Sequence, residues 1–218
     1  MAPDTPVTPR PAATVVVVRR RGGRHEVFLT KRARSMAFLG GYYVFPGGRV
    51  DTSDTNPRAT GRIIGADPDD LDKMKQDGYE PLGFITAAVR ELFEESGVLL
   101  LCDEAGRIVS GRLYREMRGL AGQNDAPFVD EAIGRGLFFA GNRLRFLQRF
   151  TTPAFSPMRF HTVFFLAEIP EGQEAGVENV EVERSLWIAP DEALEQNRSG
   201  EFKMIPPTMA ALHMVMNL

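Results

Sequence analysis

The segment at residues 84–96, FITAAVRELFEES, limits what this chain can fold into more than any other stretch. Its periodicity predicts an amphipathic helix with an apolar stripe made of Ala88, Val89, Leu92 and Phe93. Gly97 follows at the position where helices commonly end. Because an apolar stripe has to be covered, we expect this helix to pack against a sheet, with its acidic residues on the other side.

Strands that could build this sheet are predicted on both sides of the helix. Runs of β-branched and aromatic residues occur at residues 13–20, 25–32, 42–50, 98–101, 143–150 and 159–170, and around Trp187. Further helices are predicted at residues 67–77, in two pieces within an extra helical segment at 111–140, and at 190–200 and 206–216. Strands and helices are therefore interspersed along the chain. We expect the α/β class, with a mixed sheet covered by helices.

Composition narrows the class of protein and its partners. The chain has 218 residues, of which 43% are hydrophobic, and this is enough for one well-packed domain. The proline-rich residues 1–11 are expected to form a flexible arm before a domain at residues 12–218. A formal net charge of -3 argues against nucleic acid as a partner. The sequence leaves the oligomeric state open, and a homodimer is one option.

The expected compartment follows from cysteine usage and from the apolar runs. Cys102 is the single cysteine, so an intramolecular disulfide is impossible. The N-terminal residues lack the apolar core of a secretory signal, and no apolar run approaches the length of a membrane span. We therefore expect a cytoplasmic protein without a membrane partner.

Three carboxylates share one face of the predicted helix. Glu91, Glu94 and Glu95 are spaced i, i+3 and i+4, and like charges at this spacing repel one another. The face could be merely solvated, as many acidic helix faces are. It could also hold Mg²⁺ or Mn²⁺, because both ions take carboxylate oxygens and a divalent ion would remove the repulsion. A Pro-Gly-Gly turn at residues 46–48, where backbone can approach a ligand closely, favours the metal site.

The sequence RELFEESGV at residues 90–98 resembles the second half of the signature of the Nudix hydrolases at every fixed position. The resemblance implies an α/β/α sandwich on a mixed sheet, and metal-dependent cleavage of nucleoside diphosphates linked to another group. It also implies that Mg²⁺ or Mn²⁺ is held by the side chains of Glu91, Glu94 and Glu95 and by the backbone carbonyl of Gly47. Arg90 would then orient one of the carboxylates.

Members of this family often supply another carboxylate from the loop before the last strand of the sheet. The stretch EAGVENVEVERSLW offers Glu174, Glu178, Glu181 and Glu183. By resemblance to family members, we favour Glu181, which stands six residues before Trp187. It is predicted to act as the base or as an additional metal ligand, and the sequence does not separate these roles. The histidines are dispersed and are interpreted as structural: His25, His161 and His213.

The first half of the signature departs from the family pattern. A short spacer that carries a Glu normally joins the Gly-Gly pair to the Arg, whereas a long stretch separates Gly48 from Arg90 here. Counting forward from Gly48 places Asp54 at the position of that acid, and counting back from Arg90 places Leu82 there. We interpret residues 51–83 as a surface insertion within the signature, with its own short helix. It could be passive, since long surface insertions cost little, or it could shape the substrate cleft.

A second resemblance concerns the substrate. Residues 28–48, FLTKRARSMAFLGGYYVFPGG, look like the stretch before the signature in the coenzyme A diphosphatase branch of the family. The motif Phe-Pro-Gly-Gly is in register, whereas Ala37 stands where an Arg is expected. Arg32, in register, and Arg34, out of register, are the predicted phosphate contacts, because arginine suits bidentate binding of phosphate. Phe45 is the third predicted substrate-binding residue.

The long insertion and the tail FKMIPPTMAAL look more like a peroxisomal branch that acts on coenzyme A and its esters. The sequence does not end in an address of the Ser-Lys-Leu type. We expect hydrolysis of coenzyme A or an acyl-coenzyme A to adenosine 3′,5′-bisphosphate and a 4′-phosphopantetheine. The alternatives are a Nudix diphosphatase for ADP-ribose or a dinucleotide, a ligand-binding regulator without turnover, and an interaction scaffold with a solvated acidic face.

Overall fold

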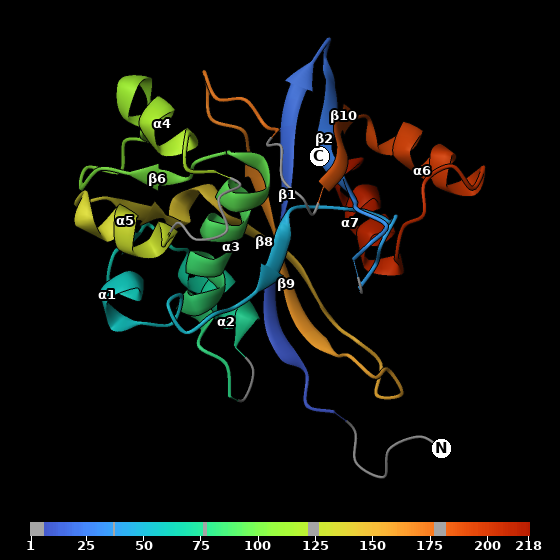
Figure 1. The fold of residues 1–218 in the computed structure, drawn as a ribbon, viewed down its shortest axis with the longest axis horizontal. Coiled ribbons are helices and arrows are strands. Elements are labelled where there is room, and N and C mark those ends of the chain that lie inside the picture. The colour runs from blue at the N-terminus through green and yellow to red at the C-terminus, as the bar shows by residue number, and fades with distance from the viewer. Residues whose placement is uncertain (1–6, 37, 76–77, 122–126, 177–181) are drawn as a thin grey trace.

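A mixed sheet forms the middle layer of the protein (Figure 1). The computed structural model describes residues 7–36, 38–75, 78–121, 127–176 and 182–218, and within them seven strands make up this sheet. Their spatial order is β10 (Val182–Ile188), β2 (Arg24–Arg32), β1 (Arg10–Arg21), β9 (Phe160–Glu168) and β8 (Arg145–Thr151), with β3 (Tyr43–Val44) beside β2 and β4 (Gly47–Arg49) beside β1. The β1–β9 pair is parallel and the other pairs are antiparallel, so the prediction of a mixed sheet is confirmed.

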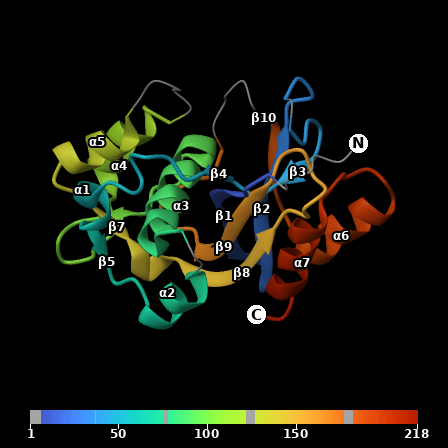
Figure 2. The same cartoon turned by 90° about the horizontal axis from the view of Figure 1, so that it is seen from below.

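Helices cover both faces of this sheet, as Figures 1 and 2 show. On one face lie α6 (Pro190–Arg198) and α7 (Pro206–Val215). The other face is covered by α3 (Pro81–Ser96), with α1 (Pro57–Thr60), α2 (Pro68–Met74), α4 (Gly111–Arg118) and α5 (Phe128–Gly134) on the same side. In the described residues this side also holds a three-stranded sheet of order β5 (Ile63–Ile64), β7 (Phe138–Ala140) and β6 (Leu101–Cys102), and the 3₁₀ turn η1 (Gly141–Arg143) follows β7. The predicted α/β/α sandwich is confirmed.

The central strand β1 shows why both faces need a covering layer. Val15 and Val17 belong to the core that contains the apolar residues of α3, whereas Val16 and Val18 belong to the core formed with α6 and α7. Successive side chains of a strand point to opposite faces of the sheet. A strand that is apolar at every position is therefore stable only between two layers.

Helix α3 has the local structure that the sequence predicts. The residues of its apolar stripe are at most 1% exposed. The helix ends at Gly97, which takes a left-handed conformation with φ of 72° and donates its N–H to the carbonyl oxygen of Phe93. Glycine adopts this conformation without steric cost, so the position of the C-terminus is set by the sequence itself. The acidic residues Glu91, Glu94 and Glu95 lie outside the buried apolar face of the helix.

The bounds of several elements differ from those that the sequence predicts. The predicted strand at residues 42–50 is split into β3 and β4 around Pro46, which has no N–H for a sheet ladder. Strand β7 lies within the segment predicted to be helical at 111–140. Strand β1 begins at Arg10, so the last two residues of the predicted arm pair with β9. No helix in the described ranges is long and apolar enough to cross a membrane.

Residues 51–83, predicted to be a surface insertion, are exposed over much of their length, but a few of them pack on the core. Asp67 does cap the predicted helix, α2, by accepting N–H groups of residues 69 and 70, although the helix ends at Met74. However, Ala59 and Met74 are 0% and 1% exposed, and the segment also supplies β5 of the second sheet. The Asp70 carboxylate further accepts the backbone N–H of Phe146 in β8 at 2.8 Å. The segment is therefore anchored to the core on the α3 side of the sheet by a few of its residues, and its description as an insertion stays a prediction.

Candidate active site

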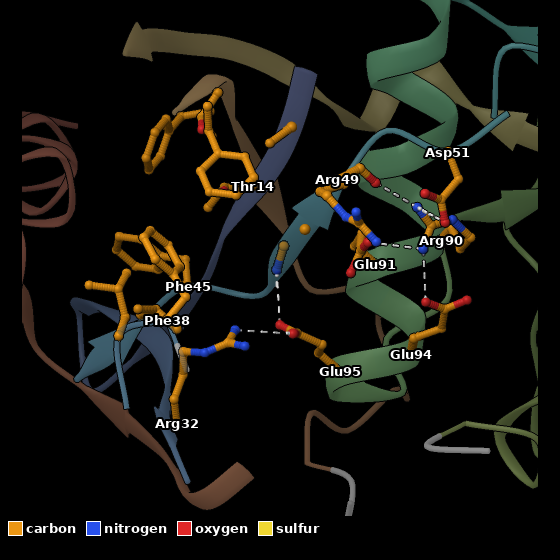
Figure 3. A pocket seen from close by; sticks show the side chains of 18 of the residues that line it. Thr14, Arg32, Phe38, Phe45, Arg49, Asp51, Arg90, Glu91, Glu94 and Glu95 are labelled. Atoms are coloured by element: carbon orange, nitrogen blue, oxygen red, sulfur yellow. Dashed lines mark hydrogen bonds and ion pairs between the residues drawn. The ribbon is translucent and has the colours of Figure 1, made fainter. Parts of the chain in front are cut away.

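A pocket of about 780 Å³ lies where β4 meets α3 (Figure 3). Its lining also includes residues of β1, β9 and the first turn of α7. All three predicted metal-binding carboxylates line it, and the side chains of Glu91, Glu94 and Glu95 are 13%, 34% and 13% exposed. The acidic face of α3 therefore borders a cavity and is not an open, solvated surface.

Close packing explains why two glycines stand beside the acids. Gly47 pairs with Thr14 of β1, and a Cβ atom on Gly47 would collide with Thr14. A Cβ atom on Gly48 would overlap the carboxylate of Glu91. The N–H of Gly47 donates a hydrogen bond of 3.0 Å to the Glu95 carboxylate. Because neither glycine carries a side chain, the backbone of β4 can lie directly against the carboxylates of α3.

Arg90 is the centre of a buried hydrogen-bond network and is itself only 7% exposed. Its Nη1 donates to Glu91 and to Glu94, each at 2.9 Å. Its Nε and Nη2 donate to the two carboxylate oxygens of Asp54 at 3.0 and 2.8 Å. Nη2 also donates to the carbonyl oxygen of Arg49 at 2.9 Å. One guanidinium thus holds two of the three pocket carboxylates in place, and Asp54 fixes the guanidinium.

Asp54 is the residue whose importance the sequence did not establish. The forward count from Gly48 placed it at the position of the family's missing acid, but the backward count placed Leu82 there. The structure decides between the two, because Asp54 is fully buried and bonded to Arg90, whereas Leu82 packs against the core in the first turn of α3. A second contact anchors Asp54, since its carboxylate accepts the N–H of Asp51 at 2.8 Å.

Burial shifts the pKa of the carboxylates of Glu91 and Glu94 on this wall. Burial raises the pKa of Glu91 to about 8, helped by Glu95 and Glu94 and opposed by Arg90. Burial also raises the pKa of Glu94, again against the lowering effect of Arg90. For Arg90 burial favours the neutral form, but the hydrogen bonds that it donates to Asp54 and the charge of Glu91 outweigh burial, so the pKa of Arg90 is raised and it stays charged. One arginine therefore does not compensate for all the acids around it.

The donor set on this wall fits Mg²⁺ or Mn²⁺ in kind. It consists of hard carboxylate oxygens, and a divalent ion would offset the surplus negative charge. Within the described residues, however, no three Asp, Glu, His or Cys side chains are gathered closely enough to hold a metal ion. Glu91 and Glu94 bond to Arg90, and Glu95 bonds to Gly47. Binding of a metal would therefore require these side chains to move closer together.

The other predicted site residues fall into three groups. Arg32 and Phe45 line the pocket, and Arg32 points across it so that its Nη1 lies 3.9 Å from an oxygen of Glu95 (Figure 3). Arg34 is exposed and is not part of the pocket lining, so the structure does not bring it to the acids. Glu181 and Glu178 lie outside the residues that the structure describes. Of their described neighbours, Glu183 forms an ion pair of 2.6 Å with Lys31.

The wall opposite the acids is one that the sequence did not reveal. It is rich in phenylalanine: Phe38, Phe45, Phe150, Phe160 and Phe164 line the pocket. These residues come from the loop after β2, the turn before β4, the end of β8 and the strand β9. Of the five, only Phe45 belongs to a motif; Phe150, Phe160 and Phe164 lie on β8 and β9, more than 100 residues after Phe38. The available signal was the aromatic content of β8 and β9, which indicates strands but not a pocket.

Comparison with known proteins identifies the family. No family model matches the chain. The crystal structure of a NUDIX hydrolase from Alicyclobacillus acidocaldarius is similar to it with a TM-score of 0.82 and 30% sequence identity, over 97% of this chain and 92% of that one. The chain belongs to the Nudix hydrolase superfamily. The stretch RELFEESGV, which resembles the Nudix signature, forms the acidic face of α3 in this structure.

Curated Nudix proteins resemble the chain as well. The protein of Caenorhabditis elegans that carries the name nudix hydrolase 7 is 29% identical, over 93% of this chain and 59% of its own length. Acyl-coenzyme A diphosphatase NUDT19 of Xenopus laevis is 26% identical, over 84% of this chain and 57% of its own length. The chain therefore spans less than two thirds of the length of these two relatives.

Proposed function

We propose that this Nudix protein is a diphosphatase that hydrolyses the pyrophosphate bond of coenzyme A or an acyl-coenzyme A with the help of Mg²⁺ or Mn²⁺. One observation carries the proposal. The carboxylates of Glu91, Glu94 and Glu95 line a single pocket, with Arg32 facing them from the other side (Figure 3). This arrangement suits a substrate with a charged centre, because a diphosphate can lie between metal-binding acids and a cationic side chain.

The residues divide the work of this reaction. Glu91, Glu94 and Glu95 would hold the divalent ion, which supplies charge neutralisation and an activated water when bound. Arg90 keeps Glu91 and Glu94 on the pocket wall through its hydrogen bonds of 2.9 Å. Arg32 would orient the diphosphate, since a guanidinium matches the geometry of phosphate oxygens. Oxygen of water bonds to one phosphorus, and the bridging P–O bond breaks to leave two phosphate monoesters.

Coenzyme A is favoured over other diphosphates by two separate observations. Residues 28–48 resemble the stretch that precedes the signature in coenzyme A diphosphatases, and the structure brings Arg32, Phe45 and Gly47 of this stretch into one pocket. The Xenopus relative is named an acyl-coenzyme A diphosphatase.

Product analysis tests this proposal. Purified protein is incubated with coenzyme A and Mg²⁺ or Mn²⁺, and the products are separated by chromatography, with the Glu94→Gln variant as the control for contaminating activity. We expect adenosine 3′,5′-bisphosphate and 4′-phosphopantetheine from the wild-type protein alone. Hydrolysis of ADP-ribose or a dinucleotide without hydrolysis of coenzyme A would contradict the proposed substrate and identify another diphosphate in its place. Absence of turnover on all three would support a ligand-binding regulator instead.

A further inference from the structure

The pocket acids of α3 stand at the end of the helix that disfavours negative charge. Glu94 and Glu95 belong to the last turn, which ends at Ser96. The C-terminus of a helix carries partial negative charge, so carboxylates are unfavourable there and cations are favourable. The last turn of α3 itself holds no basic residue. A cation from another element would therefore stabilise the turn that carries two of the three acids.

Arg118 of α4 supplies such a cation. Helix α4 lies beside this end of α3 (Figure 1), and Nη1 of Arg118 donates a hydrogen bond of 3.3 Å to the carbonyl oxygen of Gly97. The same nitrogen bonds to the carbonyl oxygen of Glu174 and to the hydroxyl of Tyr114, and Nη2 donates to the carbonyl oxygen of Gly176 at 2.8 Å. One guanidinium thus joins α4, the end of α3 and the loop after β9, because its planar fork presents several donors at once.

The loop after β9 holds the same end of α3 through its own contacts. The N–H of Gly176 donates a hydrogen bond of 2.8 Å to the carbonyl oxygen of Ser96. Gln173 is buried, and its side-chain amide bonds to the N–H and the carbonyl oxygen of Leu99 at 2.8 and 3.0 Å. The last carbonyl groups of a helix have no partner within the helix, so these contacts satisfy groups at its end. The helix-end clamp is our name for four residues: Tyr114, Arg118, Gln173 and Gly176.

The helix-end clamp stands apart from the ligand. The described residues that line the pocket include Glu94 and Glu95 but none of the four clamp residues. A substitution in the clamp therefore removes no contact of the pocket lining, and it can affect the reaction only by moving the turn that the clamp holds. Such a movement matters, because Mg²⁺ demands nearly ideal octahedral geometry from its ligands.

We propose that Arg118 is a positioning residue for the diphosphatase reaction, and that through the helix-end clamp it holds the last turn of α3 in the conformation that keeps Glu94 and Glu95 on the pocket wall. The inference rests on the proposed function and adds to it a residue that touches neither substrate nor ion. Arg90 holds the side chains of Glu91 and Glu94, whereas Arg118 holds the backbone at the end of their helix.

Three variants and the affinity for Mn²⁺ alone test the inference. Arg118→Ala removes the guanidinium, and Arg118→Lys keeps the charge but loses the fork. Arg115→Ala is the matched control, because Arg115 is an exposed arginine of the same helix outside the clamp. Electron paramagnetic resonance measures Mn²⁺ binding without substrate, at a temperature where every variant is folded. We expect Arg118→Ala to weaken binding roughly tenfold, since partners that orient metal ligands typically contribute 10- to 100-fold. Arg118→Lys should lose less, and the control should match the wild type.

Two further readouts separate positioning from general stability. With coenzyme A and saturating Mn²⁺, kcat of Arg118→Ala should fall roughly tenfold. KM should stay unchanged, because Arg118 is outside the pocket lining. Hydrogen exchange followed by mass spectrometry should show faster exchange in the last turn of α3 in Arg118→Ala and not in Arg115→Ala, because the clamp suppresses local opening of this turn.

Several results would overturn the inference. One is a lower melting temperature of Arg118→Ala with unchanged Mn²⁺ affinity and unchanged kcat, which would leave the clamp a structural role alone. Another is equally weak Mn²⁺ binding by Arg115→Ala, which would assign the effect to surface charge. If Arg118→Ala does not fold, Tyr114→Phe removes one hydroxyl of the clamp and keeps the ring. This variant should bind Mn²⁺ more weakly than the wild type, and unchanged affinity would again overturn the inference.

The wild-type protein separates this inference from the proposed function. If it binds Mn²⁺ but does not hydrolyse coenzyme A, the proposed substrate is contradicted, while weaker Mn²⁺ binding by Arg118→Ala would still support the inference. If it hydrolyses coenzyme A and Arg118→Ala matches it in Mn²⁺ affinity and kcat, the inference alone fails. Failure of the wild-type protein to bind Mn²⁺ would contradict the metal-dependent reaction and the inference together.

Discussion

The two walls of the pocket are built in opposite ways: the acids of α3 and Arg32 form a charged wall, and the five phenylalanines opposite the acids form an aromatic wall. The acids of the charged wall come from neighbouring turns of one helix, and Glu91 and Glu94 are held by hydrogen bonds to a single buried guanidinium, that of Arg90. The aromatic wall is collected from four separated parts of the chain and is held by packing. A network of charges fails when one partner is lost, whereas a packed surface loses affinity gradually. Substitutions in the charged wall should therefore cause large losses of stability or activity, whereas substitutions in the aromatic wall should weaken ligand binding gradually.

The strongest test removes the residue that anchors the charged wall. Asp54→Asn removes one charged partner of Arg90 while Glu91 and Glu94 remain, so we expect the free energy of unfolding to fall by about 1–3 kcal/mol. Denaturant titration measures the change. Asp51→Asn is the control for stability, because Asp51 is half-exposed and 3.8 Å from Arg90, and surface pairs contribute about 0–1 kcal/mol. Equal losses in the two variants would mean that the Arg90 network is not cooperative.

Glu94→Gln should separate catalysis from stability. We expect turnover to fall by more than about 100-fold, because even partners of metal ligands typically cost 10- to 100-fold when changed. The melting temperature without metal should not fall, since burial already opposes the charged form of Glu94 and raises its pKa. Steady-state kinetics and thermal unfolding provide the two readouts. Near-normal turnover would show that the carboxylates of α3 do not hold the catalytic ion.

Metal binding should stabilise the protein through the acids of α3 and not through the phenylalanines of the pocket. At ten times its dissociation constant, Mg²⁺ or Mn²⁺ should add about 1.4 kcal/mol to the free energy of unfolding, because the unfolded chain has no preformed site. The shift in melting temperature should shrink in Glu94→Gln and persist in Phe38→Ala. A shift that is equally large in both variants would indicate that the ion binds away from the acids of α3.

The smallest effect concerns the layer behind the aromatic wall. His161 is fully buried on the face of β9 opposite Phe160, where it stacks on Tyr79 and its Nδ1 lies 2.8 Å from the hydroxyl of Thr151. Burial, assisted by the charge of Arg149, lowers its pKa below 6.5. The unfolded chain then takes up the proton first, so stability should decline as the pH falls below 6.5.

Denaturant titration between pH 7 and pH 5 measures this decline, which cannot exceed about 1.4 kcal/mol per pH unit for one group. The variant His161→Phe keeps an aromatic ring at the position and should show a smaller decline over the same range. An identical pH dependence in wild type and variant would assign the decline to other groups, including the acids of the charged wall.

The sequence by itself determined the parts of this protein whose causes are local in the chain. The start of α2 at Asp67, the end of α3 at Gly97 and the apolar stripe of α3 follow from the conformations and periodicity of neighbouring residues. The positions of Glu91, Glu94 and Glu95 on one face follow in the same way, because helical spacing fixes their directions. These features also carry the signature by which the family could be recognised.

The tertiary structure alone decided which distant residues meet. Whether Asp54 or Leu82 takes the place of the signature's acid depends on how residues 51–83 fold back onto α3, and it is Asp54 that bonds to Arg90. The burial of Ala59 and Met74 in this segment could not be inferred from composition, because isolated apolar residues join the core only when another element covers them. The aromatic wall has the same origin: no local rule links Phe38 to Phe160, and only the packing of a loop against the end of β9 brings their rings together.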